Sequence, residues 1–135
     1  MPKDIRQIEG IGKSYAEKLK SIGISTVEEL LEKGATSKGR EEIAEKIGIS
    51  SKVVLKWVNK ADLMRVRGIG EEYADLLEAA GVDTVPELSR RNPENLYEKI
   101  VEVNKEKKLV RQLPGVNKVA KWVEEAKKLP KKVTY

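Results

Sequence analysis

Apolar residues recur along the chain with the period of an α-helix. The clearest apolar face occupies positions i, i+1, i+4 and i+7 and consists of Tyr15, Ala16, Leu19 and Ile22. Further along, Asn92 followed by Pro93 is typical of a helix start and leads into another apolar face. No run of alternating apolar and polar residues between turn signals indicates a strand. The pattern therefore predicts an all-α fold.

Short signals between the apolar faces predict where helices end and begin. Gly23, with apolar Ile24 after it, favours a left-handed cap of the Schellman type at the end of a helix. Thr26 and Glu29 have the spacing of a capping box, in which each side chain binds a backbone amide of the next helix start. These signals predict two consecutive helices joined by a tight connection.

The sequence contains an internal repeat, which has to be found before the fold is assigned. Sliding the sequence along itself places segment 8–30 on segment 66–88. The motif Gly-Ile-Gly, a Tyr-Ala pair and the Gly of the helix end then coincide, and Thr84 with Glu87 repeats the capping box. So many identities at one offset indicate a duplicated helical unit.

A second, larger offset sets the length of the units. It aligns segment 52–58 with segment 117–123, including one tryptophan in each. The change of offset implies an insertion near residues 103–112. We therefore predict two units, residues 1–63 and residues 64–135, packed into one compact body.

Composition excludes most enzyme chemistry. The chain of 135 residues contains no Cys and no His. It therefore has no disulfide, no thiolate nucleophile, no Cys-His zinc site and no imidazole to act as a base near neutral pH. Acidic residues and lysines remain, but neighbouring helix positions diverge and form no convergent pair. We expect a protein that is not an enzyme and has no cofactor.

Hydropathy and composition also bear on location. The N-terminal segment has no apolar stretch of the kind that a signal peptide needs, and no segment is long enough to span a bilayer. The sequence predicts a cytoplasmic protein without a membrane partner. Abundant Lys and Glu without Cys favours a heat-adapted source.

Charge is distributed unevenly along the chain. The 27 basic and 22 acidic side chains give +5 overall. Residues 1–63 carry 12 basic and 10 acidic side chains, residues 64–104 carry 5 and 9, and residues 105–135 carry 10 and 3. The basic C-terminal segment suits a polyanionic partner such as nucleic acid. Lysine is also an ordinary residue on a solvated helix face, so both interpretations stay open.

Each repeat places Gly-Ile-Gly between a short helix, ending near Glu9 or Arg67, and a longer helix beginning at Lys13 or Glu71. Glycine permits the positive φ of a tight turn. The first amides of the following helix have no intrahelical partner and, with the helix dipole, favour an anion. The sequence therefore predicts phosphate binding by the backbone without base reading, and predicts that Gly12→Val harms folding and binding together.

Two resemblances become apparent at these residues. Residues 8–30 resemble the helix-hairpin-helix motif, and the run through Gly23 and Thr26 is similar to the hairpin of the β-like DNA polymerases. From about residue 5 to residue 129 the chain resembles the family catalogued as domain of unknown function 4332, most specifically over residues 61–85. The resemblance implies two tandem helix-hairpin-helix units, like SAM domains in fold. It also implies sequence-independent binding to nucleic acid, with double-stranded DNA as the expected partner and structured RNA as the alternative.

The resemblance further implies which residues contact phosphate. In the first unit they are the turn and the lysines that follow it, Gly10, Ile11, Gly12, Lys13, Lys18 and Lys20. In the second unit they are Arg65, Arg67, Gly68 and Gly70. The carbonyl oxygens of Ile8 and Ile11 are the candidates to hold a monovalent cation, and no other metal is expected.

The second turn departs from the pattern of the motif. Glu71 and Glu72 occupy the first turn of its helix, and Asp75 and Glu78 follow. These carboxylates would neutralise the positive helix end and repel phosphate. We therefore favour the first turn as the binding site. A related turn at residues 113–116 is interpreted as structural.

Other interpretations stay open. Residues 42–62 also fit a helix-turn-helix whose exposed face would carry Ser51, Lys52 and Lys56 into a major groove, or simply a pair of packed helices. The two tryptophans are interpreted as core aromatics in preference to stacking platforms for bases. The whole chain also fits a protein-interaction or scaffold module in which the glycine turns only pack helices.

Overall fold

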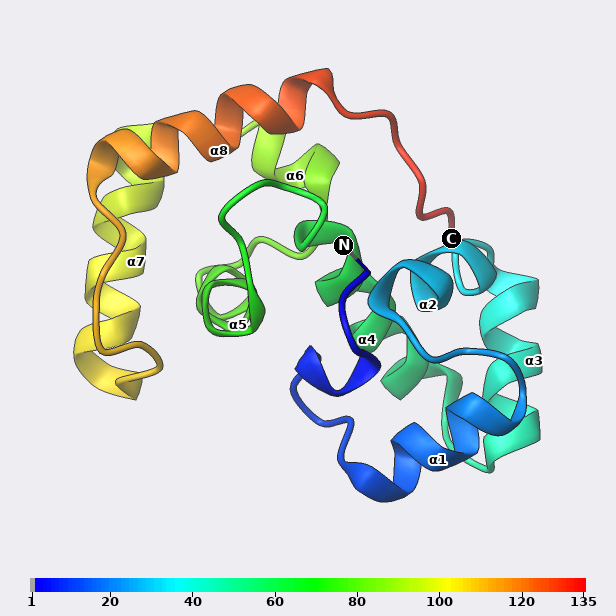
Figure 1. The fold of residues 1–135 in the computed structure, drawn as a ribbon. Coiled ribbons are helices and arrows are strands. Elements are labelled where there is room, and N and C mark those ends of the chain that lie inside the picture. The colour runs from blue at the N-terminus through cyan, green and yellow to red at the C-terminus, as the bar shows by residue number, and fades with distance from the viewer. Residues whose placement is uncertain (1) are drawn as a thin grey trace. The chain divides into compact units, whose positions relative to one another are not determined.

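The structure, a computed structural model, describes residues 2–135. In chain order the elements are η1 (Ile5–Gln7, a 3-10 helix), α1 (Lys13–Ser21), α2 (Val27–Lys33), α3 (Ser37–Ile47), α4 (Ser51–Leu63), α5 (Glu71–Ala79), α6 (Val85–Ser89), α7 (Pro93–Lys107) and α8 (Val116–Lys128) (Figure 1). Over the described range there is no strand, only an isolated bridge between Asp4 and Thr26. The predicted all-α fold is confirmed.

The chain divides into two compact units that contain the two copies of the repeat. Residues up to Asp62 form the first unit together with Lys132–Tyr135, and Leu63–Lys131 form the second. Helices α1 and α5 begin at positions that the first offset aligns, and α4 and α8 begin at positions that the second offset aligns. The offset grows because α7 has 15 residues where α3 has 11, and because the connection before α8 is longer than the connection before α4.

The last residues of the chain belong to the first unit, whereas the sequence placed everything up to residue 135 in the second. Thr134 donates its amide to the carbonyl oxygen of Ala35 at 2.8 Å. The Thr134 carbonyl accepts from Arg40 Nη2 at 2.6 Å. These backbone groups bond to the connection between α2 and α3 and to the helix after it, and we call Lys132–Tyr135 the C-terminal strap.

The helix ends of the two repeats agree largely with the sequence signals. Gly23 has φ 87°, and the amide of Ile24 donates to the Leu19 carbonyl at 2.9 Å, as the Schellman arrangement requires. The same bond joins Val82 to Leu77 at 2.9 Å after α5. At the start of α7 the Asn92 side chain accepts from the amide three residues on, at 3.0 Å.

The two predicted capping boxes differ in outcome. At α2, Thr26 Oγ1 accepts from the Glu29 amide and Glu29 Oε1 accepts from the Thr26 amide, both at 3.1 Å. The second box is wrong, because the side chain of Thr84 caps no backbone amide and its hydroxyl bonds to Glu87 Oε1 at 3.2 Å. Pro86 presets the first turn of this five-residue helix, so its start does not depend on the side-chain cap.

The capping box of α2 predicts a dependence of stability on pH. Bonds from the amide and hydroxyl of Ser25, and then from Thr26, lower the pKa of Glu29 below its ordinary value. A carboxyl whose pKa is lowered by folding adds stability above its unfolded pKa, and this stability disappears as pH falls through the folded value. Glu29→Gln should therefore flatten the loss of thermal stability below about pH 4, measured by melting curves against pH. If the melting temperature of Glu29→Gln fell with pH as steeply as that of the unaltered protein, this role of the Glu29 carboxylate would be contradicted.

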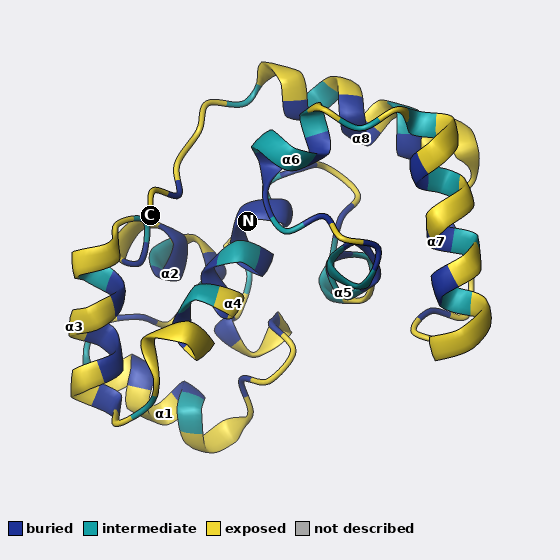
Figure 2. Cartoon of the chain, turned by 180° about the vertical axis from the view of Figure 1, so that it is seen from behind, coloured by how far each residue is buried: buried dark blue, intermediate teal, exposed yellow. Residues whose placement is uncertain are grey.

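Equivalent apolar residues form the core of each unit. Buried residues line the helices of both units (Figure 2), and the fully covered pairs at matching repeat positions include Leu19 with Leu77, Leu30 with Leu88, and Val54 with Val119. Trp57 and Trp122 are also buried, with 3% and 2% of their surface exposed. The tryptophans are core residues, as the sequence predicted. Each unit therefore holds its glycine turn against a packed interior.

Candidate nucleic-acid interface

Two glycine turns precede α1 and α5. We define the first glycine turn as residues 10–13 and the second glycine turn as residues 68–71. The helix before each turn ends earlier than predicted, since η1 ends at Gln7 and α4 ends at Leu63. The chain enters each turn from an irregular segment, which positions the glycines by backbone hydrogen bonds.

The backbone of the two turns is nearly the same. Gly10 has φ 95° and Gly68 has φ 92°, in the left-handed region where glycine carries little penalty. The amide of the central isoleucine donates to the carbonyl three residues earlier, at 3.1 Å in both turns. The side chains of Ile11 and Ile69 are buried. The isoleucine thus anchors each turn and leaves the flanking glycines at the surface.

The first glycine of each turn packs on a tryptophan. A Cβ atom at Gly10 would lie 3.2 Å from Trp57 Nε1, and one at Gly68 would lie 3.2 Å from Trp122 Nε1. The Trp57 ring in turn contacts Tyr15, with ring centroids 5.4 Å apart. The first glycine therefore serves the fold twice, through its positive φ and through this close approach.

The second glycine of each turn serves no such need. Gly12 has φ −86° and ψ −171°, and Gly70 has φ −100° and ψ −162°, which any residue adopts. A Cβ atom at either position would meet nothing within 4 Å. The expectation that Gly12→Val harms folding stays a prediction, since the backbone and surroundings of Gly12 leave room for a side chain but valine is a poorer N-cap residue than glycine. What remains is a bare Cα atom facing solvent.

The start of α1 carries unoccupied donors. Gly12 is its N-cap residue, and no side chain caps the helix, whereas the side chains of Thr26, Thr36 and Asn92 cap α2, α3 and α7. Within the described chain, the amides of residues 12–14 have no hydrogen-bond acceptor. No acidic residue lies in the first turn of α1. The donors and the positive helix end are thus free to bind an anion.

The lysines of α1 differ in their relation to the first glycine turn. Lys13, Lys18 and Lys20 are all exposed. At about 100° per residue, Lys20 follows Lys13 on the same side of α1, about 10 Å along the axis, whereas Lys18 points to another side. The ammonium of Lys18 lies 5.8 Å from the centroid of the Tyr15 ring. Lys13 is thus the lysine at the turn, with Lys20 in line for a neighbouring phosphate.

The second glycine turn is less suited to an anion. Glu71 and Glu72 lie in the first turn of α5. The amide of Arg67 already donates to Glu125 Oε2 at 3.0 Å, so a carboxylate of the protein occupies one backbone donor beside the turn. Arg65 is half-buried and Arg67 is exposed. The sequence did not indicate Glu125, because its partner lies far away along the chain.

The proposed cation ligands have a backbone role. The Ile8 carbonyl accepts the amide of Ile11, at 3.1 Å, as part of the turn. Both residues are buried, with 1% of the surface of Ile8 and 3% of the surface of Ile11 exposed. In the described residues, no group of three or more acidic side chains is placed to hold a metal ion. Cation binding at the Ile8 and Ile11 carbonyls stays a prediction.

The segment that fits a helix-turn-helix forms α3 and α4, joined through Gly48 with φ 75°. Ser51, Lys52 and Lys56 lie at the start and middle of α4, and all three are exposed. The inward face of α4 packs in the core of the first unit. Base reading by α4 stays a prediction, and packing of the two helices is what the structure shows.

The fold and the two turns define a class of protein, an all-helical chain built from a duplicated unit with a glycine turn in each copy. The chain belongs to the family described as Domain of unknown function (DUF4332), which matches residues 9–129. No solved structure matches the chain. Among the described helices, none has the length and apolar character needed to cross a membrane.

Proposed function

We propose that the protein binds the sugar-phosphate backbone of nucleic acid without strong sequence preference, and that double-stranded DNA is the partner. The contact is the first glycine turn. The observation that carries the proposal is Gly12, a solvent-facing glycine that the fold does not require, placed at an uncapped helix start without acidic residues. A bare Cα atom lets a phosphate approach the amides closely.

The donors at the turn fit a phosphate in number and kind. The amides of Gly12 and Lys13 supply backbone donors, and the Lys13 ammonium supplies a charge beside them. Backbone donors of this kind position a protein on the phosphates but carry no base information. This interpretation treats residues 8–30 as a helix-hairpin-helix, and it leaves Gly68 and Gly70 outside the contact because of Glu71 and Glu72.

Salt titration tests the proposal. Fluorescence anisotropy with two unrelated duplexes should give similar affinities at low salt, because phosphates are common to both. The affinity should fall steeply and linearly on a log-log plot as salt rises, with a slope of about −0.9 for each phosphate neutralised. The same titration with single-stranded DNA and with structured RNA of equal length shows which class of nucleic acid binds most tightly. Absence of binding at low salt would reject the proposal.

One observation favours a different function, a protein-interaction or scaffold module. Leu109 and Leu113 in the connection between α7 and α8, and Val116 at the start of α8, each expose 36–38% of their surface. Large apolar side chains exposed to solvent, when they form a patch, are typical of protein contacts. A stoichiometric protein partner, recovered from nuclease-treated lysate and lost in Leu109→Ser/Leu113→Ser, would favour this alternative.

A further inference from the structure

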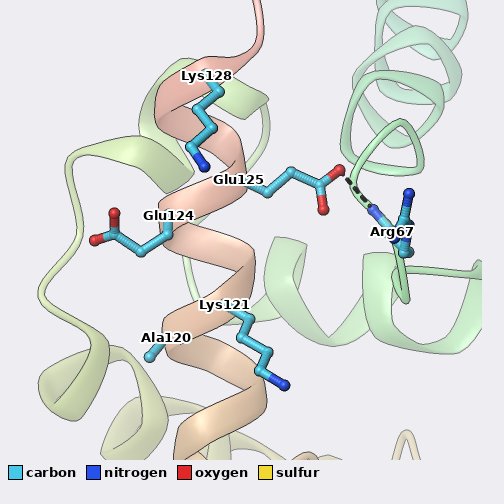
Figure 3. A pocket seen from close by; sticks show the side chains of 6 residues that line it. All are labelled: Arg67, Ala120, Lys121, Glu124, Glu125 and Lys128. Atoms are coloured by element: carbon cyan, nitrogen blue, oxygen red, sulfur yellow. Dashed lines mark hydrogen bonds between the residues drawn. The ribbon is translucent and has the colours of Figure 1, made fainter.

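A charged groove runs along α8 in the second unit. It has a volume of about 390 Å³ and is lined by Arg67, Ala120, Lys121, Glu124, Glu125 and Lys128. Figure 3 shows Lys121 and Lys128 projecting from α8, while Glu125 extends to the backbone amide of Arg67. Three cations and two carboxylates therefore share this surface.

Both carboxylates of the groove already have partners. Glu125 Oε2 accepts from the Arg67 amide at 3.0 Å. Glu124 Oε1 pairs with Lys127 Nζ at 3.2 Å, and Lys127 is not among the residues that line the groove. The side chains of Lys121 and Lys128 have no carboxylate partner among the described contacts. The charge of Glu124 is paired with Lys127, and the three lining cations face one remaining carboxylate, Glu125, so the groove carries a net positive charge.

Lys118 extends this charge towards the second glycine turn. Its Cε lies 3.7 Å from where a Cβ of Gly68 would be, and its ammonium lies 5.2 Å from the centroid of the Tyr73 ring. Positions 118, 121, 125 and 128 follow each other at intervals of three and four residues, so they share one side of α8. We call Lys118, Lys121 and Lys128, with Arg67 beside the intervening Glu125, the α8 basic stripe.

The α8 basic stripe belongs to the second unit alone. The aligned residues of the first repeat are Val53 for Lys118, Lys56 for Lys121 and Leu63 for Lys128. Two of the three lysines are thus apolar residues in the first repeat. The position of Glu125 is taken by Lys60, so the carboxylate that engages Arg67 is also particular to the second unit. The repeats differ here in charge although their helices correspond.

We propose that the α8 basic stripe is a second contact surface for a nucleic-acid backbone, separate from the first glycine turn. The inference rests on the proposed function. From Lys118 to Lys128 the stripe covers about 15 Å of helix, at about 1.5 Å per residue, which matches about four nucleotides at about 3.4 Å along one strand. Ala120 is the single apolar residue among those that line the groove, so a linear polyanion fits it better than a folded protein partner.

The first unit accordingly binds through backbone amides at Gly12, and the second unit binds through side chains of α8. This division explains how a unit with Glu71 and Glu72 at its turn still contributes to binding. The lysines contribute mainly salt-dependent affinity, since a point charge on a flexible stem reads no base.

The experiment compares two triple variants of equal charge change in the full chain. The first is Lys118→Gln/Lys121→Gln/Lys128→Gln. The control is Lys99→Gln/Lys105→Gln/Lys107→Gln, three exposed lysines of α7 in the same unit. Anisotropy with one duplex at several salt concentrations gives the slope of log affinity against log salt, and melting curves verify that all variants remain folded.

The stripe variant should lose up to about 2.7 units of salt slope, because three contacts at about 0.9 each are removed, whereas the control should lose much less. Equal slopes for the stripe variant and the control would overturn the inference while leaving the proposed function intact. Failure of the unaltered protein to bind any duplex at low salt would reject both. Loss of binding in the stripe variant combined with full binding by a Lys13→Glu variant would uphold the stripe and reject the first glycine turn.

Discussion

Gly12→Asp is expected to weaken binding to duplex DNA by about tenfold or more while leaving the melting temperature unchanged or raised. An aspartate at an N-cap accepts hydrogen bonds from the amides two and three residues on, and it is preferred there over glycine by a few tenths of a kcal/mol. Its charge also interacts favourably with the helix dipole. The backbone of Gly12, at φ −86° and ψ −171°, accepts a side chain without strain.

The same change blocks the proposed site, because the carboxylate occupies the donors that a phosphate needs. A tenfold loss corresponds to about 1.4 kcal/mol, which the loss of one charge-assisted contact supplies. Folding and binding thus move in opposite directions, and a destabilised variant cannot imitate this result. Anisotropy titration and thermal melting of the same samples measure the two effects.

Two glycine variants serve as controls for Gly12→Asp. Gly70→Asp places the same carboxylate at the second glycine turn, and it should leave the affinity unchanged because Glu71 and Glu72 already repel phosphate there. Gly10→Ala should instead lower stability, by about 1–2 kcal/mol for the left-handed φ and more from the contact with Trp57. Equal binding by Gly12→Asp and the unaltered protein would remove the first glycine turn from the interface.

Signals confined to a few residues predicted the local structure well. The glycine that ends α1 and the Thr and Glu that start α2 act on their own neighbours, so their hydrogen bonds follow from sequence spacing. The repeat extended this information to the whole chain, since α5 to α8 occupy the positions that α1 to α4 imply. The exception, Thr84, shows that Pro86 in the first turn changes the requirements of a short helix.

The sequence did not predict contacts between residues that are far apart along the chain. The bond from the Arg67 amide to Glu125 and the bond from Arg40 to Thr134 each join segments far apart along the chain. Neither has a periodic or spacing signal, because a carboxylate or guanidinium on a helix is ordinarily solvated. The sequence predicted phosphate contact for Gly12 and Gly10 alike and could not distinguish the two glycines. In the structure, φ and the space around the Cα atom distinguish Gly12 from Gly10.

Arg40→Met is expected to destabilise the first unit by about 3 kcal/mol, because methionine keeps the aliphatic volume but leaves the Gly34 and Thr134 carbonyls without a donor, while Ala35 keeps the Thr134 amide, and each buried unsatisfied group costs about 1–3 kcal/mol. Only 5% of Arg40 is exposed, and its guanidinium donates to the carbonyls of Gly34 at 2.9 Å, Ala35 at 3.0 Å and Thr134 at 2.6 Å. Water that enters the loosened site hydrates the freed carbonyls and so lowers the total cost in stability.

Fluorescence isolates the unit concerned. In a Trp122→Phe background, Trp57 reports urea unfolding of the first unit, and Arg40→Met is compared with Lys38→Met, an exposed position in the same helix. Removal of the C-terminal strap should cost less than Arg40→Met, because Gly34 and Ala35 keep their donor when Thr134 is lost. The reverse order would show that the strap stabilises the unit by burying its own surface, with Arg40 as a minor contributor.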